Sequence, residues 1–363
     1  MENKNKETYQ VSALKYRPKS FDEVVGQESI TKTLKYAVEN NKLPQALLFS
    51  GPRGVGKTSC ARILAKVINS TKENNQNYDF NFNIFELDAA SNNHVDDIKS
   101  LNEQVRIPPQ NGNYKVFIID EVHMLSSSAF NAFLKTLEEP PKHAIFILAT
   151  TEKQKIIPTI LSRCQIYDFK RISVKDCKFQ LAKIADNQNV NYDDEALTLI
   201  AKKSDGALRD ALYLYDQMIA FTENNLNLKN ISESLNLLTF DTYCRVSDLI
   251  IKNDIPKLLI EFDEIISNGY DELEFIVGLA SHFRDLILVK NKQTAEILEI
   301  GGENQKKYLS LSEKFQVNDI LKIIDLISKC ELDYRQSKNK RLLIELCLMQ
   351  IASLRLEEKT KGL

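Results

Sequence analysis

The stretch GPRGVGKTS, from Gly51 to Ser59, matches the phosphate-binding pattern G-x-x-x-x-G-K-[ST]. It has the required context, because the apolar run ALLFS (46–50) precedes it and helical periodicity follows it. Glycines let the backbone curl until its N–H groups and the N-terminus of the next helix face an anion. A strand, a phosphate loop and a helix in this order predict an α/β domain.

Four further short apolar runs follow the loop, namely IFELD (84–88), KVFIID (115–120), AIFILA (144–149) and IYDF (166–169). Continuous apolar runs of this length are typical of strands buried on both faces of a parallel sheet. Between them, SAFNAFLKTLEE (128–139) has the apolar spacing of a helix, and Pro140-Pro141 ends it. The alternation of strand and helix favours a parallel α/β layer fold.

Beyond about Ile172 the strand signals fade and only helical periods remain. One apolar stripe comprises Leu208, Ala211, Leu212 and Tyr215. Later stripes comprise Leu258, Phe262 and Ile265, then Ile276, Leu279, Phe283 and Leu286. We therefore expect an α/β domain over 1–173, a small helical domain over 174–236 and a larger helical domain over 237–363.

Four side chains in and near the loop have the chemistry of nucleoside-triphosphate hydrolysis. Lys57 is expected to reach the β- and γ-phosphates, and Thr58 to ligate Mg²⁺. Asp120 ends the strand KVFIID and Glu121 follows it, at the carboxyl end where ligands bind in open α/β sheets. Asp120 suits a metal ligand and Glu121 a general base. A solvated strand end would explain the two carboxylates but not their combination with the loop.

Three further polar residues are weaker candidates. Thr150 and Thr151 end the strand AIFILA, where a hydroxyl could sense the γ-phosphate, although strand ends often carry such residues. Arg209 lies in the small helical domain, so it could reach a triphosphate only when that domain closes. Taken alone, Arg209 would more often be a surface charge.

Composition bounds the class of protein. Of the 363 residues 43% are apolar, and 48 Lys and Arg balance 50 Asp and Glu, so contact with nucleic acid would need a local basic patch. The start MENKNKETYQ lacks the apolar core of a signal peptide, and no apolar run is long enough to span a membrane, so we expect a cytoplasmic protein. The six cysteines are scattered and predicted to be reduced and mostly buried.

Six segments, taken in order, resemble the gamma/tau subunits of bacterial DNA polymerase III, which are AAA+ clamp-loader ATPases. They are YRPKSFDEVVGQE, GPRGVGKTSCARILAK, ELDAASNNHVDDIK, DEVHMLSSSAFNAFLKTLEEPP, ATTEKQKIIPTILSRC and GALRDAL. The resemblance is dense over roughly the first 220 residues. It implies a RecA-like nucleotide domain, a helical lid and a helical collar that joins subunits into a pentameric ring.

The resemblance also implies a function and a set of site residues. The family uses ATP and Mg²⁺ to open the sliding clamp and load it on primer–template DNA, together with delta and delta-prime subunits and further gamma/tau copies. Thr151 would be a first sensor and Arg209 a second. Arg163, in LSRC (161–164), would be an arginine finger that serves an adjacent subunit, although alone it resembles a surface arginine without an acidic neighbour. The nucleotide-binding residues would be Tyr16, Arg17, Pro18, Val24, Val25, Gly26, Gly51, Arg53, Gly54, Val55, Gly56, Lys57, Thr58, Ser59, Thr150, Thr151 and Arg209.

Two features of the sequence depart from the pattern of the family. The family often has a four-cysteine zinc module before DAASNN, but the asparagine-rich stretch there contains no cysteine, so we predict no zinc. The chain ends soon after the expected collar, which predicts clamp loading without the tethering segments of the longer family form.

A non-catalytic, delta-prime-like scaffold and another AAA+ ATPase remain alternatives. Lys99 and Arg106 could contact DNA phosphates, or could form an ordinary solvated helix face.

Overall fold

The structure is a computed structural model, which describes residues 10–70, 80–110, 112–222, 224–234, 238–295 and 302–354. The chain divides into two compact units, Met1–Leu228 and Lys229–Leu363. The first unit holds the phosphate loop, and the second is helical in its described part. The finer division into domains at residues 173 and 236 stays a prediction.

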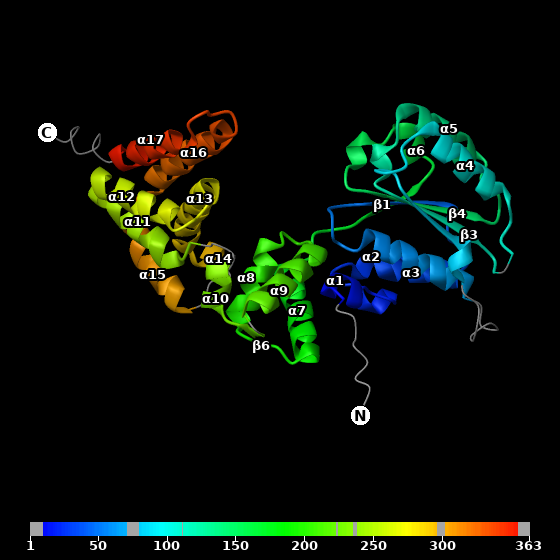
Figure 1. Ribbon diagram of the computed structural model, residues 1–363, viewed down its shortest axis with the longest axis horizontal. Helices are drawn as coiled ribbons and strands as arrows, with labels where there is room; N and C mark the ends of the chain where they lie inside the picture. Colours follow the sequence, from blue (N-terminus) through cyan, green and yellow to red (C-terminus); the bar gives the residue numbers. More distant parts are fainter. Residues whose placement is uncertain are drawn as a thin grey trace, which may run out of the picture. The chain divides into compact units, whose positions relative to one another are not determined.

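The first unit is built on a five-stranded parallel sheet (Figure 1). Its strands are β1 (Ala46–Ser50), β2 (Ile84–Asp88), β3 (Lys115–Asp120), β4 (Ala144–Thr150) and β5 (Gln165–Asp168). Their order is β2-β3-β4-β1-β5, and each neighbouring pair is parallel. All five predicted strands are confirmed to within a residue at their ends. The three central strands are buried, whereas β2 and β5 are partly exposed because they form the edges of the sheet.

Helices cover both faces of this sheet (Figure 1). On one face, α2 (Glu28–Glu39) and α3 (Lys57–Asn69) pack against Leu47 and Phe49. On the other face, α4 (Val95–Arg106), α5 (Ser127–Glu138) and α6 (Pro158–Leu161) pack against alternate strand residues such as Leu48. Alternation of side chains across the sheet sends successive apolar residues into two separate cores. The predicted α/β layer fold is therefore confirmed.

The rest of the first unit is a helical lid. It comprises α7 (Val174–Gln188), α8 (Asp194–Lys203) and α9 (Leu208–Thr222), with α1 (Ser12–Lys15) packed against α9. On α9 the predicted stripe is buried at Ala211, Leu212 and Tyr215, while Leu208 is partly exposed. The predicted helical character of this part is confirmed, and the lid also contains a small sheet that the sequence did not indicate. Two parallel two-residue strands, β6 (Asn191–Tyr192) and β7 (Asn225–Leu226), pair in the lid and are too short to leave a periodic signal.

The second unit is a helical bundle with its own core. Its helices are α10 (Leu228–Ser234, which begins at the boundary), α11 (Phe240–Lys252), α12 (Ile255–Ser267), α13 (Glu272–Val289), α14 (Lys292–Ala295), α15 (Gly302–Ser312), α16 (Val317–Tyr334) and α17 (Lys340–Ser353). The predicted stripes of α12 and α13 are buried in this core, around Phe262 and Phe283. Across the described helices of both units, none combines the length and apolar character needed to cross a membrane.

Candidate nucleotide-binding site

The loop between β1 and α3 has the backbone that its glycines predict. Gly56 immediately precedes α3 with φ +105°, and Gly54 has φ +75°, both in the left-handed region that favours glycine. A Cβ on Gly54 would lie 3.0 Å from the Cβ of Ala207 and 3.3 Å from that of Arg209. Glycine at this position therefore lets the lid pack directly on the phosphate loop.

The side chains that follow the loop meet the carboxyl end of β3. The Thr58 hydroxyl donates a hydrogen bond of 2.8 Å to Oδ2 of Asp120. Lys57 is buried, and its Nζ donates to the carbonyl oxygens of Gly51 and Pro52, both at 2.8 Å. Burial lowers the pKa of Lys57, and the charges of Glu121 and Asp120 offset part of that effect. The Thr58 hydroxyl, the Asp120 carboxylate and the Lys57 ammonium group thus lie together at the carboxyl end of the parallel strands.

The Glu121 carboxylate is held from the end of β4. Its Oε2 accepts hydrogen bonds from the backbone N–H of Thr151 at 3.2 Å and from the Thr151 hydroxyl at 2.9 Å. The Glu121 backbone has φ +46°, which costs energy in a residue with a side chain. Thr150 is fully buried, and its hydroxyl oxygen accepts from the backbone N–H of Glu152 at 3.1 Å. The adjacent threonines therefore have different partners, and Thr151 is the one that contacts Glu121.

A cavity of about 950 Å³ lies over the loop between the sheet and the lid, within the first unit. Most of the expected site residues line it, including Glu121 and Arg209. The others are Tyr16, Arg17, Pro18, Val24, Val25, Arg53, Gly54, Val55, Gly56, Lys57, Thr58, Ser59 and Asp120. Five expected residues do not line it, namely Gly26, Gly51, Thr150, Thr151 and Arg163.

Several residues that line the cavity were missed from the sequence. They come from the lid, from the first helix and from the end of β2, and include Leu14, Asp88, Gln180, Leu208, Tyr213 and Asp216. A signal existed for Leu208, because it neighbours Arg209, but its place in an apolar stripe indicated packing alone. Asp216 also accepts a hydrogen bond of 2.7 Å from the backbone N–H of Ser12. This bond ties the first helix to the lid.

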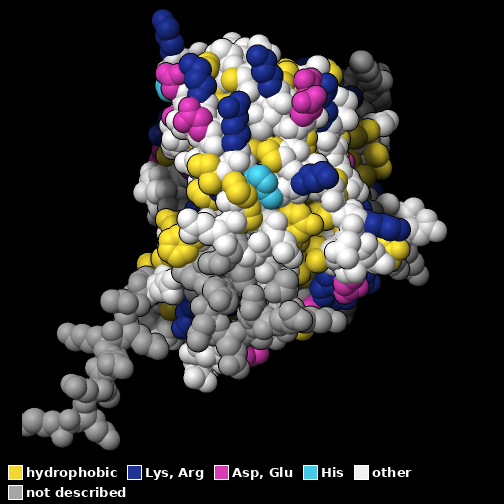
Figure 2. All heavy atoms as spheres, turned by 90° about the vertical axis from the view of Figure 1, so that its right-hand side faces the viewer, with side chains coloured by type: hydrophobic (Ala, Val, Ile, Leu, Met, Phe, Trp, Pro, Cys, Tyr) yellow, Lys and Arg dark blue, Asp and Glu magenta, His cyan; other side chains and the backbone are white. Residues whose placement is uncertain are grey.

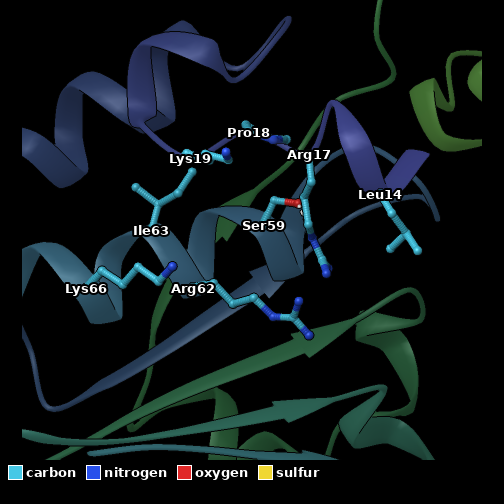
Figure 3. A pocket seen from close by; sticks show the side chains of 8 residues that line it. All are labelled: Leu14, Arg17, Pro18, Lys19, Ser59, Arg62, Ile63 and Lys66. Carbon is cyan, nitrogen blue, oxygen red and sulfur yellow. Dashed lines mark hydrogen bonds between the residues drawn. The ribbon is translucent and has the colours of Figure 1, made fainter. Parts of the chain in front are cut away.

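A smaller cavity of about 220 Å³ adjoins the first one and lies against α3 (Figure 3). Arg17 and Arg62 extend to the same side of this helix, and Nε of Arg17 donates to the Ser59 hydroxyl at 3.4 Å. Burial, followed by the charge of Arg62, lowers the pKa of Arg17. The guanidinium group of Arg17 therefore lies against the first turns of α3, a position that would favour an anion.

Arg163 is paired within the chain, so the expectation of an arginine without an acidic partner was wrong. Its Nη2 lies 2.7 Å from Oε1 of Glu138, at the end of α5, and its Nη1 donates to the carbonyl oxygen of Thr159 at 2.7 Å. Glu138 is 25 positions away, a contact that sequence neighbours could not reveal. Cys164 beside it is partly buried, and burial raises the pKa of its thiol to about 11.

The candidate DNA-contacting residues lie on the exposed side of α4. Nζ of Lys99 forms an exposed ion pair of 2.9 Å with Asp96, and Arg106 is exposed in the last turn. Figure 2 views the molecule from the right-hand side of Figure 1, where α4 and α5 lie at the top, and shows lysine and arginine side chains mixed with acidic ones over the upper part of this view. A mixed surface of this kind fits a solvated helix face as well as it fits a phosphate-binding patch.

The described residues offer few groups that could bind a metal ion. No cluster of three or more His, Cys, Asp or Glu side chains there could hold a metal ion. Magnesium at nucleotide sites needs only one or two protein ligands, because phosphates and water complete its shell. The oxygens of Thr58 and Asp120 fit that requirement. Residues 71–79, in the asparagine-rich stretch expected to lack a zinc module, lie outside the described residues.

Comparisons with known proteins point to one family over nearly the whole length. Family models described as "DNA polymerase III, delta subunit", "DNA polymerase III clamp loader subunit, ATPase lid domain" and "DNA polymerase III subunits gamma and tau domain III" match residues 26–173, 177–224 and 227–363. The chain is 32% identical over 362 residues to DNA polymerase III subunit gamma of Buchnera aphidicola subsp. Baizongia pistaciae, covering 95% of this chain and 97% of that protein.

Two other proteins are similar to this chain over a smaller share of their own length. DNA polymerase III subunit tau of Bacillus subtilis (strain 168) is 37% identical over 357 residues, which is 95% of this chain. The chain spans 63% of the length of that protein. Among solved structures, the RuvB Holliday junction branch migration motor of Thermotoga maritima is similar with a TM-score of 0.49 and 24% identity, over 65% of this chain and 79% of that chain.

Proposed function

The chain belongs to the gamma/tau family of DNA polymerase III subunits, and on this premise we propose that it is the ATPase motor subunit of a replicative clamp loader. In this role it binds and hydrolyses ATP to open a sliding clamp and place it on primer–template DNA in the cytoplasm. The near-complete coverage of a gamma subunit and the match to a clamp-loader ATPase lid support the proposal.

The observation that carries the ATPase proposal is the hydrogen bond between Thr58 and Asp120 beside Lys57. Bound Mg²⁺ would neutralise the negative charge that develops on the phosphate oxygens during hydrolysis. Thr58 and Asp120 would supply its protein oxygens, and Lys57 would hold the phosphates at the loop. Backbone N–H groups at the N-terminus of α3 would bind the same phosphates.

Glu121 is proposed as the general base. Thr151 donates twice to Oε2, which leaves Oε1 as the oxygen that can take a proton from the attacking water. The contact also supports the assignment of Thr151 as a sensor, because any movement of Thr151 would move the Glu121 carboxylate with it. Thr150, which is fully buried, supports the turn after β4 by accepting a hydrogen bond from the backbone N–H of Glu152.

Two arginines would couple hydrolysis to larger motions. Arg209 lines the cavity from the lid, and its backbone N–H donates to the carbonyl oxygen of Gly54 at 3.4 Å. Opening of the lid would therefore remove Arg209 from the phosphates. Arg163 does not line the cavity of its own chain, which supports a finger that reaches the γ-phosphate held by an adjacent subunit of a pentameric ring.

The proposed partners are delta and delta-prime subunits, further gamma/tau copies, the sliding clamp and primer–template DNA. A delta-prime-like scaffold without ATPase activity is the second candidate, because the model that matches 26–173 describes a delta subunit. The complete set of Lys57, Thr58, Asp120 and Glu121 favours the ATPase. Zinc is not part of the proposed site.

Steady-state ATP hydrolysis distinguishes the two candidates. It is measured for the chain alone and with delta-type subunits, each with and without sliding clamp and primed DNA. The motor proposal predicts hydrolysis that the clamp and DNA stimulate once the partner subunits are present. A scaffold would show partner-dependent assembly with hydrolysis no higher than that of the partners alone.

A further inference from the structure

His123 lies in the turn after β3, beside the candidate base Glu121 and the end of β4. Its side chain is only 7% exposed. Nδ1 lies 3.1 Å from the Thr150 hydroxyl oxygen and 3.3 Å from Oε2 of Glu121. Nε2 faces the other way and lies 3.5 Å from Oε1 of Glu152. One imidazole ring thus lies between two carboxylates and touches the end of β4.

Thr151 holds Oε2 of Glu121, and Nδ1 of His123, which is hydrogen-bonded to the Thr150 hydroxyl, lies 3.3 Å from the same oxygen. Thr151 donates to Oε2 through its backbone N–H and its hydroxyl, and Nδ1 of His123 approaches that oxygen from the turn. Glu121 needs such support because its backbone is in the left-handed region, which a residue with a side chain adopts at a cost. A carboxylate with one oxygen fixed has its second oxygen aimed in a defined direction.

We propose that His123 is a positioning residue for the general base. Its Nδ1, which is anchored on the Thr150 hydroxyl, packs against Oε2 of Glu121 and restricts the carboxylate together with Thr151, so that Oε1 faces the attacking water. The inference rests on the proposed function, since it assigns a task only if Glu121 acts as the base. His123 itself touches neither nucleotide nor water in this account. It acts on turnover through Glu121 alone, whereas a residue that merely fills the core would affect stability.

Three substitutions separate the two ring nitrogens. His123→Ala removes both. His123→Asn places an amide N–H near the position of Nδ1, and His123→Gln places one near Nε2. Each is assayed in the assembled loader with sliding clamp and primed DNA, with ATP affinity measured separately. His143→Ala is the matched control, because Nε2 of His143 lies 3.0 Å from the carbonyl oxygen of Val105, away from the cavity.

The proposal predicts a fall in kcat with little change in KM for ATP. His123→Ala should lower kcat by about 10-fold to 100-fold, which reaches only the lower limit of the roughly 100-fold to 10,000-fold that general acid–base catalysis contributes. His123→Asn should restore most of the lost rate, while His123→Gln should not. His143→Ala should hydrolyse ATP at the wild-type rate. If His123→Ala does not fold, the comparison between the Asn and Gln variants still shows whether the Nδ1 position is the one that turnover needs.

Three outcomes would overturn the proposal. They are wild-type kcat in all His123 variants, equal rescue by Asn and Gln, and a change confined to KM. Glu121→Gln separates this result from a failure of the proposed function. If Glu121→Gln abolishes hydrolysis while the His123 variants keep it, only the positioning role fails. If Glu121→Gln hydrolyses ATP like the wild type, the base assignment fails and the role of His123 fails with it.

Discussion

Thr58 and Asp120 are 62 positions apart in the sequence, and their side chains meet at 2.8 Å at the carboxyl edge of the sheet. Thr58 belongs to the first turn of α3, and Asp120 ends β3, two strands away from β1. The contact brings a hydroxyl and a carboxylate to the position where a phosphate loop would present a nucleotide. The proposed Mg²⁺ site depends on this pair.

Thr58→Val tests that site with a side chain of nearly equal volume. Loss of the hydroxyl should lower kcat for ATP hydrolysis by about 100-fold, the scale on which one preorganised contact to developing charge is lost. Hydrolysis is measured across a range of Mg²⁺ concentrations. Thr58→Ser is the control, since it keeps the oxygen and should retain most activity. Equal activity of the Val and Ser variants would contradict the assignment.

Arg163→Ala tests the finger in trans. We expect the chain to bind ATP normally, while hydrolysis in the assembled ring falls by about 1,000-fold or more, as for arginine fingers in related phosphoryl transfer. ATP binding and single-turnover hydrolysis are measured on the same preparations. The assignment would be wrong if binding by the isolated chain fell as far as turnover did.

Glu138→Gln is the control for that experiment, because Glu138 pairs with Arg163 inside the chain. The pair is partly exposed, and such pairs contribute about 1 kcal/mol or less. The Gln variant should therefore fold normally and keep the finger. Hydrolysis in the ring should equal or exceed that of the wild type, since Arg163 is released from its partner.

Lys99→Gln combined with Arg106→Gln tests DNA contact by α4. If both side chains contact phosphates, the slope of log affinity against log salt should fall by about 2. Binding of primed DNA to the assembled loader is titrated at several salt concentrations. Lys257→Gln is the matched control, because Lys257 pairs with Asp254 three positions away as Lys99 pairs with Asp96. An unchanged slope in the double variant would eliminate both residues as phosphate contacts.

His282 should make the stability of the second unit depend on pH. Its Nε2 lies 3.0 Å from the Ser247 hydroxyl, and burial lowers its pKa from 6.5 to about 4. Between these pH values His282 is therefore protonated in the unfolded chain and neutral in the folded chain. The free energy of unfolding should fall as pH drops below about 6.5, by about 2 kcal/mol at pH 5.

Urea unfolding at pH 7 and pH 5 measures this effect. His282→Phe is the comparison, since it keeps an aromatic ring among Phe240, Tyr243 and Tyr308 and removes the titration. From pH 7 to pH 5, the free energy of unfolding of the wild type should fall by about 2 kcal/mol relative to that of the variant. This change is expected whichever of the two proteins is the more stable at pH 7. A difference independent of pH would show that His282 does not titrate in this window.

The sheet and most of the cavity could be predicted from the sequence because their signals are local. Each strand is a continuous apolar run, and the phosphate loop has its pattern between a strand and a helix. Lys57, Thr58, Asp120 and Glu121 all lie at element ends, so the topology of a parallel sheet brings them together. Arg209 was less certain because its approach to the loop depends on packing of the lid at Gly54.

The contacts that escaped prediction are those between distant side chains. His123 stands close to Glu121 in the sequence, but its approach to Thr150 and Glu152 depends on the pairing of β3 with β4. Glu138 reaches Arg163 only because α5 ends beside the segment that follows α6. The strands β6 and β7 are two residues long, so periodicity could not reveal them.

The most direct test of the central claim is ATP hydrolysis by the chain with its delta-type partners, measured with and without sliding clamp and primed DNA. If this chain is the motor, clamp and DNA together will stimulate hydrolysis. Glu121→Gln in this chain should then remove the stimulated rate while ATP still binds. Hydrolysis that stays flat under every addition, or a stimulated rate that survives Glu121→Gln, would contradict the proposal that this chain is the motor of a clamp loader.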